Sequence, residues 1–201
     1  MTPNLYHNDL FVLIHGLSSS KNEWFTEHKN LTDYFRDNSI SFIALNLYGH
    51  GDFPADEPNF SADYIDDDLW PIFIDKSVAK ITHSISIEDQ VRSFTNVHII
   101  SYSIGSVVAI EVAKRITKCA SLSLCVPDPD YSINDCYSLC NSVDQVNAIK
   151  TTIFSGIKDD EVPYKDIERL LEGHTHIHHH AYDAGHSLPT QWIDDLLNEF
   201  E

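Results

Sequence analysis

Short apolar segments alternate along this chain with segments that have helical periodicity. The apolar segments span residues 10–14, 41–46, 96–101, 119–126, 150–155 and 175–182. Helices are expected at residues 21–37, 86–94, 104–117, 133–147, 164–172 and 189–200. This alternation favours an α/β fold, a three-layer sandwich in which a doubly wound, mainly parallel six-stranded sheet lies between two layers of helices. With 201 residues and 42% hydrophobic content, we expect one domain over residues 1–201.

Ser103 lies at the junction between the third apolar segment and the helical segment that follows it, in the run Ser101-Tyr102-Ser103-Ile104-Gly105. A sharp turn between a strand and a helix lifts a serine hydroxyl out of the sheet, where a base can reach it. The two backbones pass so close there that the positions two before and two after the serine need very small side chains, which Gly105 provides fully and Ser101 approximately. Taken alone, the pattern also fits an ordinary loop serine.

Two later strand ends carry the partners that a nucleophilic serine needs. The fifth apolar segment runs into an acidic loop with Asp159 and Asp160, and the sixth is followed by His186. A serine hydroxyl needs a base to take its proton, and the base needs a third group that fixes its tautomer and orientation. The order Ser, Asp, His, each just after a strand, therefore predicts a catalytic triad.

The first apolar segment ends in His15-Gly16-Leu17. A glycine here lets the backbone turn so that the next amide points into a site. The Leu17 N–H is then one candidate donor to the oxyanion that forms in acyl transfer, and the Ile104 N–H, at the start of a helix, is the other.

These motifs together resemble those of the α/β-hydrolase family, in particular small serine esterases and lipases with a reduced cap. The matching pieces are His15-Gly16, residues 46–52, 101–105 and 156–163, and Ala184-Gly185-His186, spread over about residues 10 to 200. The resemblance implies that Asp159 rather than Asp160 is the acid, because the acid follows the turn glycine by three residues and precedes a Val-Pro pair. It also implies the strand order 4-3-5-6-7-8 in the family's own numbering, without the family's first two strands.

The charge balance excludes one class of partner. With 13 basic and 31 acidic residues the formal net charge is −18, which argues against nucleic acid, since phosphate backbones need clustered Lys and Arg. No segment approaches the length of a membrane span, and residues 1–9 contain no Lys or Arg, so no secretion signal is expected. The four cysteines lack a CxxC spacing and suit a reducing compartment. We expect a cytoplasmic protein; its oligomeric state is left open.

Residues 53–85 fit neither a strand nor a helix of this scheme, and they mix prolines with acidic and bulky apolar residues. One interpretation is a small lid whose patch from Trp70 to Ile74, including Phe73, accepts the acyl part of a substrate. A surface excursion whose aromatics pack on the core fits equally well. The other candidate substrate-binding residues are His15, Gly16 and Tyr102.

Histidines recur at positions 174, 176, 178, 179 and 180. Alternate residues of a strand share a face, and imidazole binds zinc, copper or nickel. A strand nevertheless spreads such side chains too far apart to converge on one ion, so an edge strand is favoured over a metal site.

Ser20 and Glu23 have the spacing of a capping box at the start of the first expected helix.

The function expected from these residues is hydrolysis of a small-molecule carboxylic ester or thioester through Ser103, His186 and Asp159, with no cofactor and no metal. Fold does not fix chemistry, so two alternatives stay open. One is a catalytically silent, hydrolase-like binding protein. The other is a lyase or oxygenase that reuses the same fold.

Overall fold

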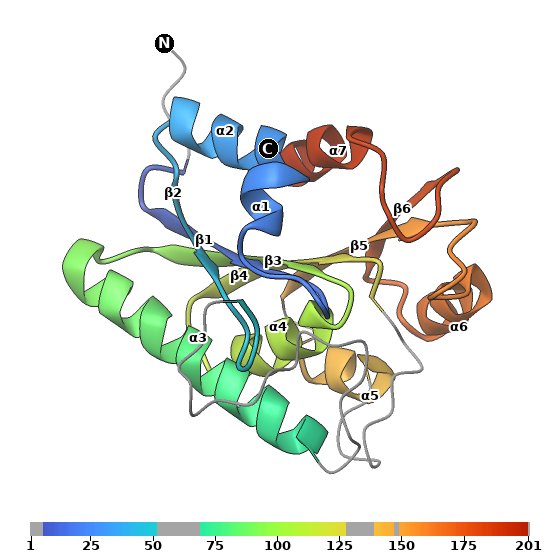
Figure 1. The fold of residues 1–201 in the computed structure, drawn as a ribbon, viewed down its shortest axis with the longest axis horizontal. Coiled ribbons are helices and arrows are strands. Elements are labelled where there is room, and N and C mark those ends of the chain that lie inside the picture. Colours follow the sequence, from blue (N-terminus) through green and yellow to red (C-terminus); the bar gives the residue numbers. More distant parts are fainter. Residues whose placement is uncertain (1–5, 52–68, 128–138, 147–148, 201) are drawn as a thin grey trace.

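A computed structural model describes residues 6–51, 69–127, 139–146 and 149–200 (Figure 1). Among these residues, one sheet contains six strands: β1 Asp9–Ile14, β2 Ser41–Leu45, β3 Asn96–Tyr102, β4 Cys119–Cys125, β5 Lys150–Gly156 and β6 His178–Tyr182. Every neighbouring pair is parallel, in the order β2-β1-β3-β4-β5-β6. This confirms the predicted fold class and the strand order that the resemblance implied. No strand precedes β1 within the described part of the chain.

The central strands β1, β3, β4 and β5 are buried along most of their length because both faces of the sheet are covered. All six residues of β1 are buried, with Leu10, Val12 and Ile14 in one apolar cluster and Phe11 and Leu13 in another. Side chains of a strand alternate between the two faces of a sheet, so two clusters imply a layer of helices on each face. The sheet is therefore doubly wound.

Helices form both of these layers (Figure 1). Their bounds are α1 Glu23–Thr26, α2 Lys29–Asp37, α3 Trp70–Arg92, α4 Gly105–Ala113, α5 Leu139–Val143, α6 Tyr164–Gly173 and α7 Gln191–Phe200. The helices α1, α2 and α7 pack with Phe11 and Leu13, whereas α3, α4, α5 and α6 pack on the opposite face. The predicted helices at 104–117, 164–172 and 189–200 are confirmed as α4, α6 and α7, with ends that differ by a few residues.

The prediction of one continuous helix at 21–37 is wrong, because the structure has two helices there, α1 and α2. His28 separates α1 from α2 and has φ −106° and ψ 29°, outside the helical region. The capping box is wrong as well: α1 has no side-chain cap, and Glu23 bonds His28 instead. Of the helix expected at 133–147, the described residues contain α5 and a 3-10 turn at Asp144–Val146; residues 133–138 lie outside the described part.

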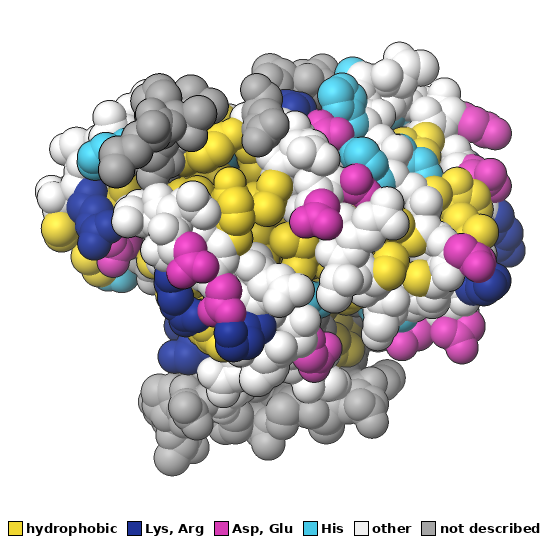
Figure 2. Space-filling view, turned by 90° about the horizontal axis from the view of Figure 1, so that it is seen from above, with side chains coloured by type: hydrophobic (Ala, Val, Ile, Leu, Met, Phe, Trp, Pro, Cys, Tyr) yellow, Lys and Arg dark blue, Asp and Glu magenta, His cyan; other side chains and the backbone are white. Residues whose placement is uncertain are grey.

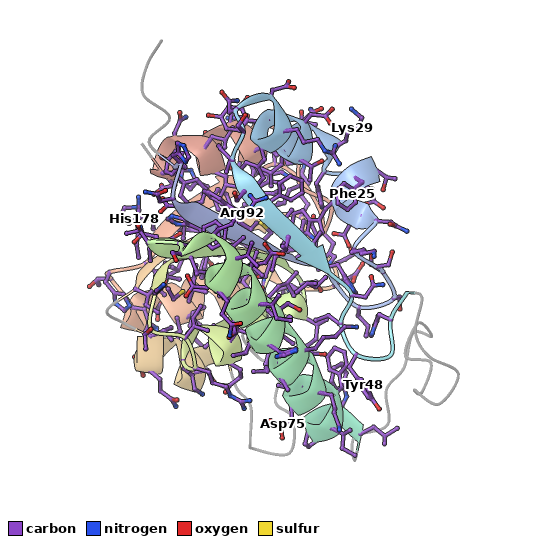
Figure 3. All side chains as sticks on the ribbon, turned by 90° about the vertical axis from the view of Figure 1, so that its left-hand side faces the viewer. Phe25, Lys29, Tyr48, Asp75, Arg92 and His178 are labelled. Atoms are coloured by element: carbon purple, nitrogen blue, oxygen red, sulfur yellow. The ribbon has the colours of Figure 1, made fainter. Side chains whose placement is uncertain are left out.

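The long helix α3 overturns part of the lid interpretation. Residues 70–85 are helical, and the helix expected at 86–94 is the end of α3 (Figure 3). Pro71 lies in the first turn of α3, where a missing N–H leaves no hydrogen bond unmade. Trp70 and Phe73 are 6% and 0% exposed and belong to the core, which is the second of the two interpretations given above. Residues 53–68 lie outside the described residues.

Two histidines of the edge strand β6, His178 and His180, contact a glutamate of helix α7. The strand begins at His178, so the predicted strand at 175–182 is too long at its start. His178 Nδ1 and His180 Nε2 lie 3.0 and 2.8 Å from the two carboxylate oxygens of Glu199 on α7, and Lys150 Nζ lies 3.2 Å from one of them. Burial would raise the pKa of Glu199, but the bonds from His180, His178 and Lys150 hold it at about 2.

Across the described residues, no group of three or more His, Cys, Asp or Glu side chains could hold a metal ion.

Acidic side chains are spread over the face of the molecule seen in Figure 2, in line with the net charge of −18. No helix within the described ranges is both long enough and apolar enough to cross a membrane.

Candidate active site

Ser103 occupies a strained turn between β3 and α4. Its φ of 49° lies in the left-handed region that residues other than glycine rarely adopt. The turn is held because the Ser103 N–H donates to the carbonyl of Cys125 on β4 at 2.8 Å, and the Ser106 N–H donates back to the Ser103 carbonyl at 2.9 Å. The serine is half-buried, and its side chain faces a cavity.

The two small positions that flank the turn are explained by its packing. A Cβ atom added at Gly105 would lie 2.5 Å from the carbonyl oxygen of His15, so no side chain fits there. Ser101 is fully buried, and its hydroxyl lies 3.2 Å from that of Ser106. A serine is therefore accommodated two residues before Ser103, because it makes a hydrogen bond across the turn.

The loops after β5 and β6 are pressed against one another, which brings the acid to the histidine. A Cβ atom added at Gly156 would lie 2.2 Å from the carbonyl oxygen of Gly185 and 2.5 Å from that of Ala184. The Lys158 N–H donates to the Ala184 carbonyl at 2.9 Å. Asp159 and His186 therefore meet even though they are 27 residues apart in the chain.

The Asp159 carboxylate is fixed by three hydrogen bonds. Its Oδ1 accepts the N–H groups of Glu161 and Val162, both at 2.9 Å, and its Oδ2 lies 2.9 Å from His186 Nδ1. The Asp159 side chain is 2% exposed, and the His186 side chain is 18% exposed. The structure thus pairs Asp159 with the histidine, whereas Asp160 is exposed to solvent.

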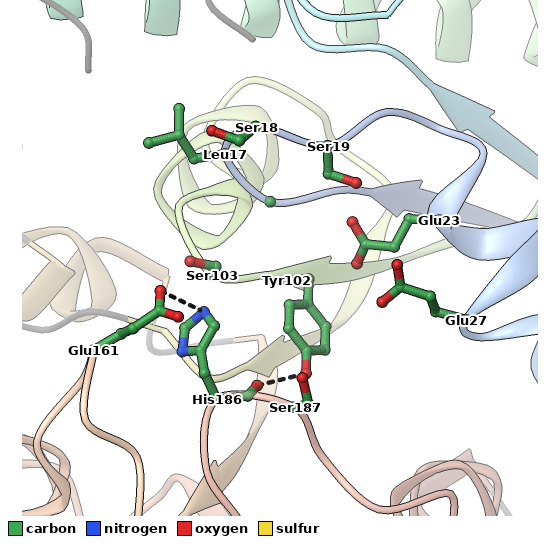
Figure 4. A pocket seen from close by; sticks show the side chains of 11 residues that line it. Leu17, Ser18, Ser19, Glu23, Glu27, Tyr102, Ser103, Glu161, His186 and Ser187 are labelled. Carbon is green, nitrogen blue, oxygen red and sulfur yellow. Dashed lines mark hydrogen bonds and ion pairs between the residues drawn. The ribbon is translucent and has the colours of Figure 1, made fainter. Parts of the chain in front are cut away.

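Ser103 and His186 line the same cavity, which has a volume of about 500 Å³ (Figure 4). This size is in the usual range for a small-molecule site. His186 Nε2, the nitrogen turned away from Asp159, lies 3.7 Å from a carboxylate oxygen of Glu161. The cavity is lined by Gly16, Leu17, Ser18, Ser19, Glu23, Glu27, Tyr102, Ser103, Glu161, His186 and Ser187.

The turn after β1 passes directly against the serine. A Cβ atom added at Gly16 would lie 3.3 Å from Ser103 Cβ, and Leu17 lines the cavity. Ile104 directly follows Ser103 and precedes the first residue of α4. Their amides stay the predicted oxyanion donors, because both belong to backbone next to the serine.

His15 does not line the cavity, so the structure does not support its predicted contact with substrate. It is fully buried, and its Nε2 accepts the N–H of Leu47 at 3.0 Å, which leaves Nδ1 to donate to the Gly16 carbonyl at 2.7 Å. Burial lowers the pKa of His15 to about 4, so the ring is neutral at pH 7. It holds the turn at Gly16 to the loop after β2.

Tyr102 lines the cavity, but its hydroxyl is engaged with the histidine loop. It donates to the His186 carbonyl at 2.7 Å and accepts the Leu188 N–H at 3.1 Å. Its ring stacks on His28 with the centroids 5.0 Å apart, and burial raises the pKa of the phenol. Tyr102 therefore positions the loop that carries His186.

Replacing Tyr102 by phenylalanine is expected to lower kcat about tenfold, since it leaves a backbone N–H and a carbonyl of the histidine loop unpaired. The measurement is kcat for a p-nitrophenyl ester, with the melting temperature as a check on folding. Tyr34→Phe, on the exposed side of α2, is the matched control and should keep its kcat. An unchanged kcat in Tyr102→Phe would argue against this role.

The structure does not bring every predicted residue to the cavity, and it adds others. Trp70 and Phe73 lie in the core and are not part of the lining. The carboxylates of Glu23, Glu27 and Glu161 line the cavity, although the sequence did not predict this. Glu161 lies two residues after Asp159 in the acidic loop, which was the one available signal.

Comparison with known families and structures agrees with the geometry. A family model described as the alpha/beta hydrolase family matches residues 11–143. No curated protein sequence matches the chain.

Solved structures with the same fold are distant in sequence. TT1662 from Thermus thermophilus has a TM-score of 0.77 and 14% identity, covering 98% of this chain and 89% of that one. The esterase Pf2001 from Pyrococcus furiosus has a TM-score of 0.69 and 14% identity, covering 98% of this chain and 79% of that one. Est1E from Butyrivibrio proteoclasticus, with ferulic acid bound, has a TM-score of 0.74 and 13% identity, covering 99% and 92%.

Proposed function

Because the chain belongs to the alpha/beta hydrolase family, we propose that it is a serine hydrolase that cleaves carboxylic esters or thioesters. Ser103 is the nucleophile, His186 the general base and acid, and Asp159 the residue that orients the histidine. The observation that carries the proposal is the bond of 2.9 Å between His186 Nδ1 and Asp159 Oδ2, with the same histidine lining the cavity that Ser103 faces.

The residues perform the reaction in two steps. Ser103 Oγ attacks the carbonyl carbon of the substrate while His186 Nε2 takes the hydroxyl proton, and Asp159 stabilises the imidazolium that forms. His186 then gives this proton to the alcohol or thiol that leaves. A water molecule, deprotonated by His186, hydrolyses the acyl-enzyme and regenerates Ser103.

The negative charge on the carbonyl oxygen is stabilised by backbone donors. The amides of Leu17 and Ile104 are assigned this role because a Cβ atom added at Gly16 would lie only 3.3 Å from Ser103 Cβ, and because Ile104 is the N-cap residue of α4. Such donors act in a site with little water, where one of them contributes about 10²- to 10³-fold to kcat.

One of the similar structures supports an ester as the substrate, and another holds a carboxylic acid. Pf2001 is named an esterase, and Est1E holds ferulic acid. These structures therefore support the class of reaction, which is hydrolysis of an ester.

We also propose that the enzyme works in a reducing compartment such as the cytoplasm. Cys119 and Cys125 on β4 are both free thiols. Burial raises the pKa of Cys119 to about 12 and raises that of Cys125 well above the ordinary value of a thiol, so neither is a reactive thiolate at pH 7.

Replacing Ser103 by alanine tests the function. We expect turnover of a p-nitrophenyl ester to fall by on the order of 10⁶-fold, to the background rate, because no other group in the triad can form the acyl-enzyme. The measurement is kcat, with a circular dichroism spectrum that matches the parent protein. Ser84→Ala on α3 is the control and should keep its activity.

Turnover that survives in Ser103→Ala would refute the nucleophile. If the parent protein turns over no ester or thioester in a panel of varied chain length, the silent binding protein becomes the better description.

A further inference from the structure

Three carboxylates line the described cavity, together with the imidazole of His186. The carboxylates are those of Glu23, Glu27 and Glu161, and no Lys or Arg among the described residues belongs to the lining. A cavity lined by charge of one sign, with walls of low dielectric constant, concentrates the electrostatic potential and raises the local concentration of ligands of opposite sign. The charge of the cavity therefore bears on which substrate reaches Ser103.

The three carboxylates divide into two groups (Figure 4). Glu161 comes from the loop after β5, and its carboxylate lies 3.7 Å from His186 Nε2. It therefore already faces the proposed catalytic histidine. Glu23 and Glu27 come from α1 and the residue that ends it, and their side chains face one another on the other side of the cavity. This pair is placed to meet a substrate bound at Ser103.

Glu23 is charged although it is only 8% exposed. Burial would raise its pKa, but hydrogen bonds from His28 and Ser19 outweigh burial and bring the pKa below the ordinary value. His28 Nε2 lies 3.2 Å from Glu23 Oε1. A buried carboxylate held in its ionised form is a fixed negative charge at the wall of the cavity.

The rest of the lining does not suit a long apolar acyl chain. Leu17 and Tyr102 are its large apolar side chains, and three serines, Ser18, Ser19 and Ser187, contribute hydroxyl groups. Pockets that bind apolar groups are lined mainly by hydrophobic and aromatic side chains. The lining thus favours a short substrate with a charged end over a fatty acyl ester.

We propose that the enzyme selects esters or thioesters that carry a cationic group, such as an ammonium or a guanidinium, which Glu23 and Glu27 bind while the carbonyl lies at Ser103. The inference rests on the proposed hydrolase function and names its substrate class.

The test compares substrates that differ only in charge. On the acyl side, 4-nitrophenyl 4-(trimethylammonio)butanoate is compared with 4-nitrophenyl 5,5-dimethylhexanoate, in which carbon replaces the ammonium nitrogen. On the leaving-group side, acetylthiocholine is compared with S-(3,3-dimethylbutyl) thioacetate. We expect kcat/KM for the cationic member of at least one pair to be higher by about tenfold at low salt, and the ratio to fall in 0.5 M NaCl, since salt screens the attraction.

Glu27→Gln should lower that ratio about threefold to tenfold, and Glu27→Lys should lower it further, because the pair loses or reverses a charge. Glu168→Gln is the matched control: it makes the same change in net charge on the exposed side of α6, outside the cavity, and should leave the ratio unchanged. Equal or better hydrolysis of the neutral members in both pairs, with turnover still dependent on Ser103, overturns the cationic preference but not the hydrolase. If neither member of either pair is hydrolysed and Ser103 cannot be acylated, the proposed function fails and this inference fails with it.

Discussion

Replacement of Asp159 by asparagine is expected to lower kcat about 10⁴-fold without unfolding the protein. The Glu161 and Val162 amides donate to Asp159 Oδ1, and in the variant they hold the oxygen of the new amide in that place. The NH₂ group then faces His186 Nδ1, where a carboxylate oxygen now lies at 2.9 Å. The imidazole must accept at Nδ1 and carry its proton at Nε2, so it can no longer take the proton of Ser103.

Asp160→Asn is the control for this variant, because it removes the same charge one residue away. Asp160 is exposed, so kcat should change little. Steady-state kinetics on a p-nitrophenyl ester measure both variants. A similar loss in the two variants would mean that overall charge, and not the orientation of the histidine, accounts for the effect.

Replacement of Gly105 by alanine is expected to lower kcat by 10²-fold or more and to destabilise the fold by about 1–3 kcal/mol. The new Cβ would lie 2.5 Å from the His15 carbonyl oxygen and 3.1 Å from that of Ile14. Both atoms belong to the backbone of β1 and its turn, so relief requires α4 or that turn to move. Either movement displaces Ser103 from the predicted oxyanion donors.

Gly173→Ala provides the comparison for this variant. An added Cβ at Gly173, the last residue of α6, meets no atom within 4 Å. Its kcat and its midpoint in urea denaturation should match those of the parent protein. The prediction for Gly105 is contradicted if its alanine variant behaves like that of Gly173.

The sheet could be predicted from the sequence because its signals are local. Most strands of the sheet contain a short apolar run, and β1 illustrates the fully buried kind, with all six residues covered. Parallel strands separated by helices then leave few arrangements. The edge strand β6 was predicted too long because histidines on either side of its start carry no signal of where pairing begins.

The helix α3 was missed because its sequence gives mixed signals. Pro71 was interpreted as a loop residue, although proline is tolerated in the first turn of a helix. The following residues are not strongly amphipathic, since apolar residues also lie on the outer side of α3: Ile72, Ile87 and Val91 are 46%, 47% and 73% exposed. Its inner side is fixed by tertiary contacts: the Tyr48 N–H bonds the Ser77 hydroxyl, and Arg92 bonds Ser41 on β2 (Figure 3). Packing of this kind depends on tertiary contacts that the sequence pattern does not contain.

At the candidate site, the sequence predicted the residues at strand ends, and Gly16, Leu17 and Tyr102 line the cavity as expected, whereas its carboxylates were not predicted. Ser103, Asp159 and His186 follow β3, β5 and β6, and parallel strands bring these ends to one edge of the sheet. The spacing from Ser20 predicted that Glu23 caps a helix. Its bond to His28 could not be predicted, because that bond depends on the break between α1 and α2. The lining of the cavity is set by how the loops fold over the edge of the sheet.

The most direct measurement of the central claim is labelling of the folded protein with a fluorophosphonate, followed by mass spectrometry of its peptides. Reagents of this class phosphonylate a serine whose hydroxyl is activated by a base: the serine oxygen bonds to phosphorus, and fluoride leaves. The proposed mechanism predicts a single modification, at Ser103, that is lost when the protein is unfolded before treatment. Modification at another serine, such as Ser187 in the same cavity, or no modification under conditions that label a control esterase, would contradict it.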